Sequence, residues 1–107
     1  MYIKNLTPHD VTIYLGKGRS VTFPAFGKDK TSRLNEQATL IDNIDGIDVY
    51  EVVYGEPDWL PEPERGVIYI VSSMVKDACP NRTDLYCPYG LIRDEKGNII
   101  GAKGLRR

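Results

Sequence analysis

The sequence lacks long hydrophobic runs and the common catalytic signatures. Its longest apolar run, residues 67–71, falls far short of the about 20 residues that span a bilayer. The N-terminal residues contain no apolar signal-peptide core. The nucleotide-binding motifs GxGxxG and GxxxxGK[ST] are absent, as is the GxSxG elbow of hydrolases. We therefore expect a soluble cytosolic protein with no membrane partner and no standard dinucleotide, triphosphate or α/β-hydrolase site.

Histidine and cysteine are scarce, which limits metal and nucleophile chemistry. His9 is the only histidine, and Cys79 and Cys87 are the only cysteines. A zinc site needs about four ligands of these types, so we expect no metal and no cofactor. We interpret the cysteines as reduced thiols, although their spacing also permits a disulfide. His9 can serve as a structural hydrogen-bonding residue, a ligand contact or a general base.

Charge of neither sign dominates the chain. The 14 basic and 15 acidic residues give a net charge of -1, which argues against a nucleic acid polymer as partner. A length of 107 residues fits one domain, residues 1–107. Seven tyrosines suit ligand walls and subunit contacts, although strands also favour tyrosine. Because so small a domain buries only about 60–70% of its unfolded surface, we expect a homo-oligomer.

Alternating apolar and polar residues predict strands joined in hairpins. The predicted strand pairs are residues 11–15 with 20–23, 38–41 with 47–54, and 91–93 with 98–100, each flanking a glycine-containing turn. Residues 2–6 predict a further short strand. Residues 24–37 show no periodicity and predict a loop, either solvated or closing over an anion through Lys28, Lys30 and Arg33.

The second half of the chain predicts a buried strand and a helix. Residues 55–66 contain too many prolines for a helix or a central strand, and predict an extended surface segment anchored by Trp59 and Leu60. Residues 67–71 are apolar throughout, which indicates a central strand covered on both faces. Ser72 or Ser73 can cap a short helix near residues 73–79. The predicted class is α+β: a small antiparallel sheet or partly open barrel built from hairpins, with one short helix.

Polar residues at the ends of these elements form the candidate ligand site. The first strand can pair beside residues 67–71, which would bring the polar ends of these segments together. The candidate ligand-binding residues are Asn5, Thr7, His9, Ser72, Ser73, Asn81, Arg82, Asp84 and Arg93. Arginine binds phosphate or carboxylate through paired hydrogen bonds. Two alternatives stay open, because serine before a helix is also the ordinary cap and Arg82 can pair with Asp84 instead.

Five segments resemble, in the same order, a family of short phage and prophage proteins. They are Asn5-Leu6-Thr7-Pro8-His9, Leu60-Pro61-Glu62-Pro63, Tyr69-Ile70-Val71-Ser72-Ser73, Asn81-Arg82-Thr83-Asp84-Leu85 and Arg93-Asp94-Glu95-Lys96-Gly97. Members of that family usually begin with NLTPH and carry YIVS followed by P-x-R-x-D-L. The family has no assigned activity, so the resemblance implies a phage setting and an intact single domain rather than a reaction.

A phage setting favours a role against bacterial immunity. One such role is to sequester the cyclic nucleotide or ADP-ribose-derived signals that defence systems make, which needs a polar pocket but no catalytic machinery. We therefore predict a phage-encoded counter-defence protein that binds a small nucleotide-like immune signal in the host cytoplasm. The alternatives are an inhibitor that binds a host defence protein directly through Trp59 and the acidic proline segment, a hydrolase of the signal, or a virion component. The sequence favours binding over turnover.

Overall fold

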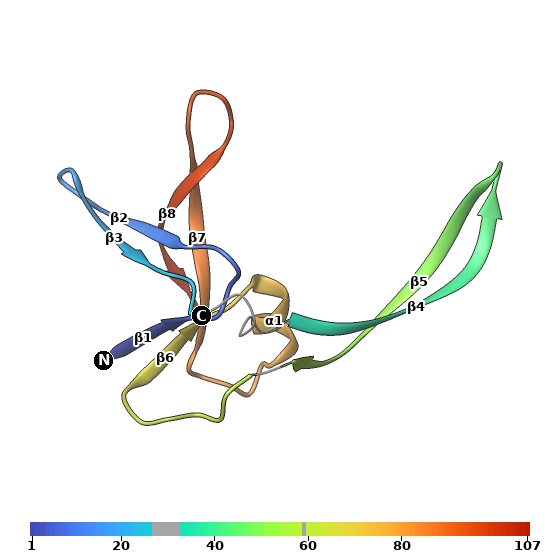
Figure 1. The fold of residues 1–107 in the computed structure, drawn as a ribbon, viewed down its shortest axis with the longest axis horizontal. Helices are drawn as coiled ribbons and strands as arrows, with labels where there is room; N and C mark the ends of the chain where they lie inside the picture. The colour runs from blue at the N-terminus through green and yellow to red at the C-terminus, as the bar shows by residue number, and fades with distance from the viewer. Residues whose placement is uncertain (27–32, 59) are drawn as a thin grey trace.

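The computed structural model describes residues 1–26, 33–58 and 60–107, which form eight strands and one short helix (Figure 1). In chain order these are β1 (Tyr2–Asn5), β2 (Val11–Gly16), β3 (Arg19–Phe23), β4 (Arg33–Ile44), β5 (Ile47–Asp58), β6 (Val67–Ile70), α1 (Ser73–Ala78), β7 (Leu85–Arg93) and β8 (Ile99–Arg106). The predicted α+β class, with hairpins and one short helix, is confirmed. No helix among the described residues is long and apolar enough to cross a membrane.

Six of the strands form a curled sheet in the order β1-β6-β7-β8-β2-β3. The β2–β3 and β7–β8 pairs are the predicted antiparallel hairpins, whereas β1–β6, β6–β7 and β2–β8 pair in parallel. Gly18 and Gly97 have φ angles of 74° and 84° in the two hairpin turns. Glycine adopts such angles without steric cost, which explains its presence there.

The hydrophobic core lies between β6 and α1. Tyr69, Ile70 and Val71 are at most 1% exposed, so this part of the predicted segment is covered on both faces. Val67 and Ile68 are half-buried. The core cluster consists of Leu6, Tyr69, Val71, Val75 and Leu85. Full burial of one aliphatic side chain of this kind stabilises a fold by about 1.5–3 kcal/mol. The core therefore fixes the ends of β1, β6 and α1 relative to one another.

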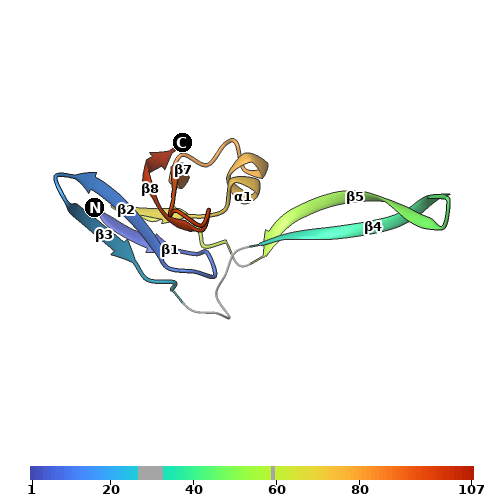
Figure 2. The ribbon, with the colours of Figure 1, turned by 90° about the horizontal axis from the view of Figure 1, so that it is seen from above.

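The remaining strands, β4 and β5, form a separate two-stranded sheet that we call the arm. It extends away from the rest of the molecule, which we call the body, in both views (Figures 1 and 2). The radius of gyration is 16.6 Å, against about 13 Å expected for a compact chain of this length. The arm is therefore held to the body at its base alone.

The arm corrects two expectations from the sequence. Residues 33–37 belong to β4 rather than to a loop, and residues 55–58 belong to β5 although Pro57 lies among them. Both strands of a two-stranded sheet are edges, where a missing proline N–H is tolerated. The predicted roles of Lys28, Lys30 and Trp59 fall outside the described residues.

Candidate functional site

Asn5 organises the turn that contains three of the predicted site residues. Its amide nitrogen Nδ2 donates to the carbonyl oxygens of His9 and Phe23, both at 2.8 Å. Its oxygen Oδ1 accepts from the backbone N–H of Thr7 at 2.9 Å and from the Thr7 hydroxyl at 2.6 Å. An asparagine amide offers two donors and two acceptor positions, so all four are used. Asn5 is 2% exposed, and it ties β1 to the following turn and to the end of β3.

The serines after β6 lie at the start of α1. The hydroxyl of Ser72 accepts a hydrogen bond from the backbone N–H of Val75 at 3.2 Å, which makes Ser72 the helix N-cap. Its side chain therefore satisfies one of the donors that a helix start leaves without a partner. Ser73 is exposed in the first turn. Of the two roles that the sequence left open for Ser72, the structure gives it the capping one.

Arg82 and Asp84 form a paired contact after α1. The guanidinium Nε and Nη2 of Arg82 donate to the two carboxylate oxygens of Asp84, each at 2.9 Å. Nη2 also donates to the carbonyl oxygen of Pro61 at 2.9 Å. The hydrogen bond from Arg82 lowers the pKa of Asp84 below its usual value, and the same bond raises the pKa of Arg82. Arg82 thus fastens the segment before β6 to the segment before β7.

The predicted site residues divide into separate groups. The predicted pairing of β1 beside β6 is present, with Asn5 opposite Ile70, so the Asn5 turn and Ser72 lie at the same end of the sheet. Asn81, Arg82 and Asp84 follow α1, on the way to the first residue of β7. Arg93 lies in the β7–β8 hairpin, where Nη1 donates to the carbonyl oxygen of Gly97 at 2.9 Å.

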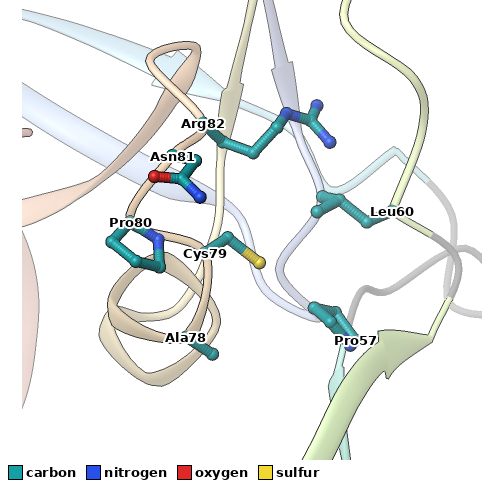
Figure 3. A pocket seen from close by; sticks show the side chains of 7 residues that line it. All are labelled: Pro57, Leu60, Ala78, Cys79, Pro80, Asn81 and Arg82. Carbon is teal, nitrogen blue, oxygen red and sulfur yellow. The ribbon is translucent and has the colours of Figure 1, made fainter.

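A cavity of about 400 Å³ brings two of these residues together with the base of the arm (Figure 3). It is lined by Pro57, Leu60, Ala78, Cys79, Pro80, Asn81 and Arg82. In Figure 3 the Arg82 side chain extends toward Leu60, and the Cys79 sulfur lies between the α1 side and the Leu60 side of the cavity. Small-molecule sites typically measure about 300–1,000 Å³, so this cavity is at the small end of that range.

A second cavity of about 180 Å³ adjoins the first through shared lining residues. Cys79, Pro80 and Arg82 line both, and the second adds Lys76, Thr83, Leu85 and Arg107. Three cationic side chains, Lys76, Arg82 and Arg107, therefore line one continuous region. Cations gathered around a small cavity attract anions such as phosphate and carboxylate groups.

Sequence reasoning missed the contributions of Pro57, Leu60 and Lys76 to this region. The cavity forms because α1 contacts β4 and β5 near the base of the arm. These contacts join α1 to segments at least 15 residues earlier in the sequence, and no local pattern marks them. The sequence indicated that residues 81–84 after Pro80 are polar, but the surface that faces them could be found only from the fold.

Cys79 and Cys87 are not joined in a disulfide, in agreement with the interpretation as reduced thiols. Cys87 is buried and Cys79 is partly buried at the cavity. Among the described residues, no three histidine, cysteine, aspartate or glutamate side chains are grouped in a way that could hold a metal ion.

Comparisons with protein-family models, curated proteins and solved structures give no match to this chain. The region around Cys79, Asn81 and Arg82 combines a cavity with cationic side chains. We call this region, with its two adjoining cavities, the Arg82 pocket.

Proposed function

We propose that this protein binds and sequesters a small anionic, nucleotide-like molecule in the Arg82 pocket. In the phage setting that the sequence resemblance implies, the molecule is an immune signal such as a cyclic nucleotide or an ADP-ribose derivative. The observation that carries the proposal is the cavity of about 400 Å³ beside a fixed guanidinium.

The orientation of Arg82 supports this proposal. Asp84 and the Pro61 carbonyl hold Nε and Nη2, and among the described residues no acceptor is bonded to Nη1. A guanidinium has five N–H donors in a fixed planar arrangement. Because Asp84 and Pro61 already restrict the side chain, Nη1 can donate to a ligand with little further loss of conformational freedom.

The surrounding residues supply complementary chemistry. Lys76 and Arg107 add positive charge for phosphate, and the Asn81 amide can both donate and accept toward a sugar hydroxyl or a base edge. Leu60 and Pro57 give apolar surface for the flat face of a base. Such a mixed lining is typical of small-molecule sites, in which a few polar groups fix orientation within an apolar wall.

The lining favours retention of the ligand over its conversion. General acid–base chemistry usually employs histidine or a carboxylate positioned at the reacting atom. Among the described residues, the lining of both cavities contains neither, and His9 lies on the turn after β1 instead. We therefore place sequestration before hydrolysis as the function.

The test is to incubate the purified chain with cyclic dinucleotides, cyclic mononucleotides and ADP-ribose, and to measure free ligand before and after heat denaturation. We expect at least one compound to disappear from solution and to return unchanged when the protein unfolds. Recovery of a cleaved product would show that the protein hydrolyses the ligand and would contradict sequestration. Failure of the whole panel to bind would contradict it.

A matched set of variants locates the site. Asn81→Ala and Lys76→Ala should each weaken binding about threefold to thirtyfold, because each loses one polar contact to the ligand. Arg93→Ala is the control, since Arg93 lies in the β7–β8 hairpin and outside both cavities. Equal loss of binding in the control variant would place the ligand elsewhere.

A further inference from the structure

One face of the arm is apolar in the middle of its length. In the antiparallel register, Leu40 is opposite Tyr50 and Ala38 is opposite Val52. Residues directly opposite each other in such a pair project from the same face, and alternate residues along a strand share a face. Tyr54 therefore joins Tyr50 and Val52 on this apolar face, and Glu36 opposite Tyr54 ends it toward the base.

The opposite face of the arm is mixed in character. Thr39 is opposite Glu51, and Gln37 is opposite Val53. Ile44 is opposite Ile47 near the tip, and by the same alternation this pair lies on the mixed face. Leu40, Tyr50, Val52 and Tyr54 are 41–56% exposed on the apolar face. A two-stranded hairpin alone is marginally stable in water at best, so the apolar face requires a partner.

The charges of the chain are divided between arm and body. The arm, residues 33–58, contains seven of the 15 acidic residues and one of the 14 basic ones, Arg33. It therefore carries a charge of −6, and the rest of the chain carries +5, which together give the net charge of −1. A surface that is both apolar and acidic is complementary to one that is apolar and basic, and the body supplies the basic charge.

The body has an apolar groove. The β2–β3 and β7–β8 hairpins diverge from the point where Ile13 pairs with Ala102 (Figure 1). A cavity of about 150 Å³ is lined by residues of both hairpins, and its apolar lining residues are Val11, Pro88, Leu91, Ile99, Ile100 and Ala102. Leu91, Ile99 and Ile100 are 44–54% exposed there. Among the described residues, the lining also includes Asp10 and has no lysine or arginine. The basic charge lies elsewhere on the two hairpins, since residues 11–23 carry +2 and residues 85–106 also carry +2.

The arm points away from the β2–β3 and β7–β8 hairpins of its own chain in both views (Figures 1 and 2). We propose that the apolar face of the arm docks into the groove between the β2–β3 and β7–β8 hairpins of a second copy of this chain. The second copy returns its own arm to the first, which gives a reciprocal dimer with twofold symmetry. This inference goes beyond the proposed ligand binding and stands independently of it.

The exposed side chains of the apolar face and the groove set the size of such a dimer contact. Leu40, Tyr50, Val52 and Tyr54 on the apolar face are 41–56% exposed. At roughly 100 Å² each, about half of what a large side chain can bury, they expose about 400 Å². In a reciprocal dimer each chain also buries its groove, where Leu91, Ile99 and Ile100 add about 300 Å² on the same basis. The sum of about 700 Å² is close to the about 800 Å² that one partner contributes to an interface of standard size.

We would test the proposal by light scattering during gel filtration of the full chain. A concentration of about 100 μM is suitable, because interfaces of this size associate there. We expect twice the 12.1 kDa chain mass. Leu40→Glu on the apolar face and Ile99→Glu in the groove should each weaken the dimer at least tenfold. Val53→Glu on the mixed face and Leu15→Glu outside the groove lining add the same charge at equally exposed positions and should leave the dimer intact.

Three results would overturn the proposal. A monomeric wild-type chain would leave the arm for a different partner, such as a host protein. A dimeric Leu40→Glu variant would show that the apolar face is not part of the interface. A dimeric Ile99→Glu variant would show that the groove is not part of the interface, and would favour packing of one arm against the other.

Crosslinking gives a second measurement that does not depend on the folding of the groove variant. A photoreactive benzoylphenylalanine in place of Tyr50 is combined with an isotopically labelled wild-type chain. We expect labelled peptides from residues 85–106 or 11–23 in the crosslinked product. Crosslinks to labelled residues 34–58 would instead show arm-to-arm contact and contradict the proposal.

Discussion

The guanidinium of Arg82 binds both carboxylate oxygens of Asp84 at 2.9 Å, and the same side chain reaches the carbonyl oxygen of Pro61. The two side chains are 21% and 14% exposed, so water screens this ion pair only in part. Arg82 thereby has two roles in our account: it joins the segments around the core, and it presents Nη1 to the pocket.

Loss of Arg82 should lower stability as well as ligand affinity. Arg82→Ala removes three hydrogen bonds and leaves the Asp84 carboxylate partly buried without its partner, which should lower the free energy of unfolding by about 2–3 kcal/mol. Urea denaturation measures this change. Arg93→Ala, which removes one exposed hydrogen bond, should cost less than about 1 kcal/mol. Equal costs in the two variants would mean that the Arg82–Asp84 pair does not stabilise the fold.

The same pair predicts a loss of stability in acid. The pKa of Asp84 is lowered in the folded state, chiefly by its hydrogen bond from Arg82. Its contribution to stability is therefore fully present above the unfolded pKa of about 3.9, and is lost as the pH falls through the lower folded value. Denaturation curves from pH 6 to pH 2.5 should show a steeper acid loss for the wild type than for Asp84→Asn. Equal acid sensitivity of the wild type and Asp84→Asn would show that Asp84 does not cause the loss of stability in acid.

Asn5 should behave as a structural residue rather than as a ligand contact. Asn5→Ala removes four hydrogen bonds at a position 2% exposed, and should lower the free energy of unfolding by about 2–4 kcal/mol. Asn98→Ala, at an exposed turn position, is the matched control and should cost less than about 1 kcal/mol. If Asn5→Ala kept wild-type stability but bound the ligand more weakly, Asn5 would instead be a ligand contact.

Local patterns predicted most of the body. The apolar run at residues 67–71, the glycines at the hairpin turns and Ser72 before α1 each act through neighbouring residues, so each could be found in the sequence. The β1–β6 pairing followed from the burial expected of Val67–Val71. The parallel β2–β8 pairing, by contrast, has a single paired position, Ile13 opposite Ala102, which no local pattern marks.

The arm was predicted in its outer half only. Residues 38–41 and 47–54 alternate clearly, whereas Pro57 suggested that the strand ends earlier. For the site, the sequence identified Asn81 and Arg82 as pocket residues but grouped them with Asn5 and Ser72. Asn5 and Ser72 instead form hydrogen bonds with backbone groups around them. Structural and ligand-binding polar residues cannot be told apart in a sequence, because the difference lies in their hydrogen-bond partners.

The most direct test of the central claim is a titration of the ¹⁵N-labelled chain with ADP-ribose and cyclic di-AMP, followed by amide chemical shifts. Our account predicts that at least one of these probes shifts the amides of Cys79, Asn81 and Arg82, while those of Thr7 and Asn98 stay in place. Shifts centred on the Asn5 turn, or no shift at millimolar concentrations of either probe, would contradict a ligand site at the Arg82 pocket.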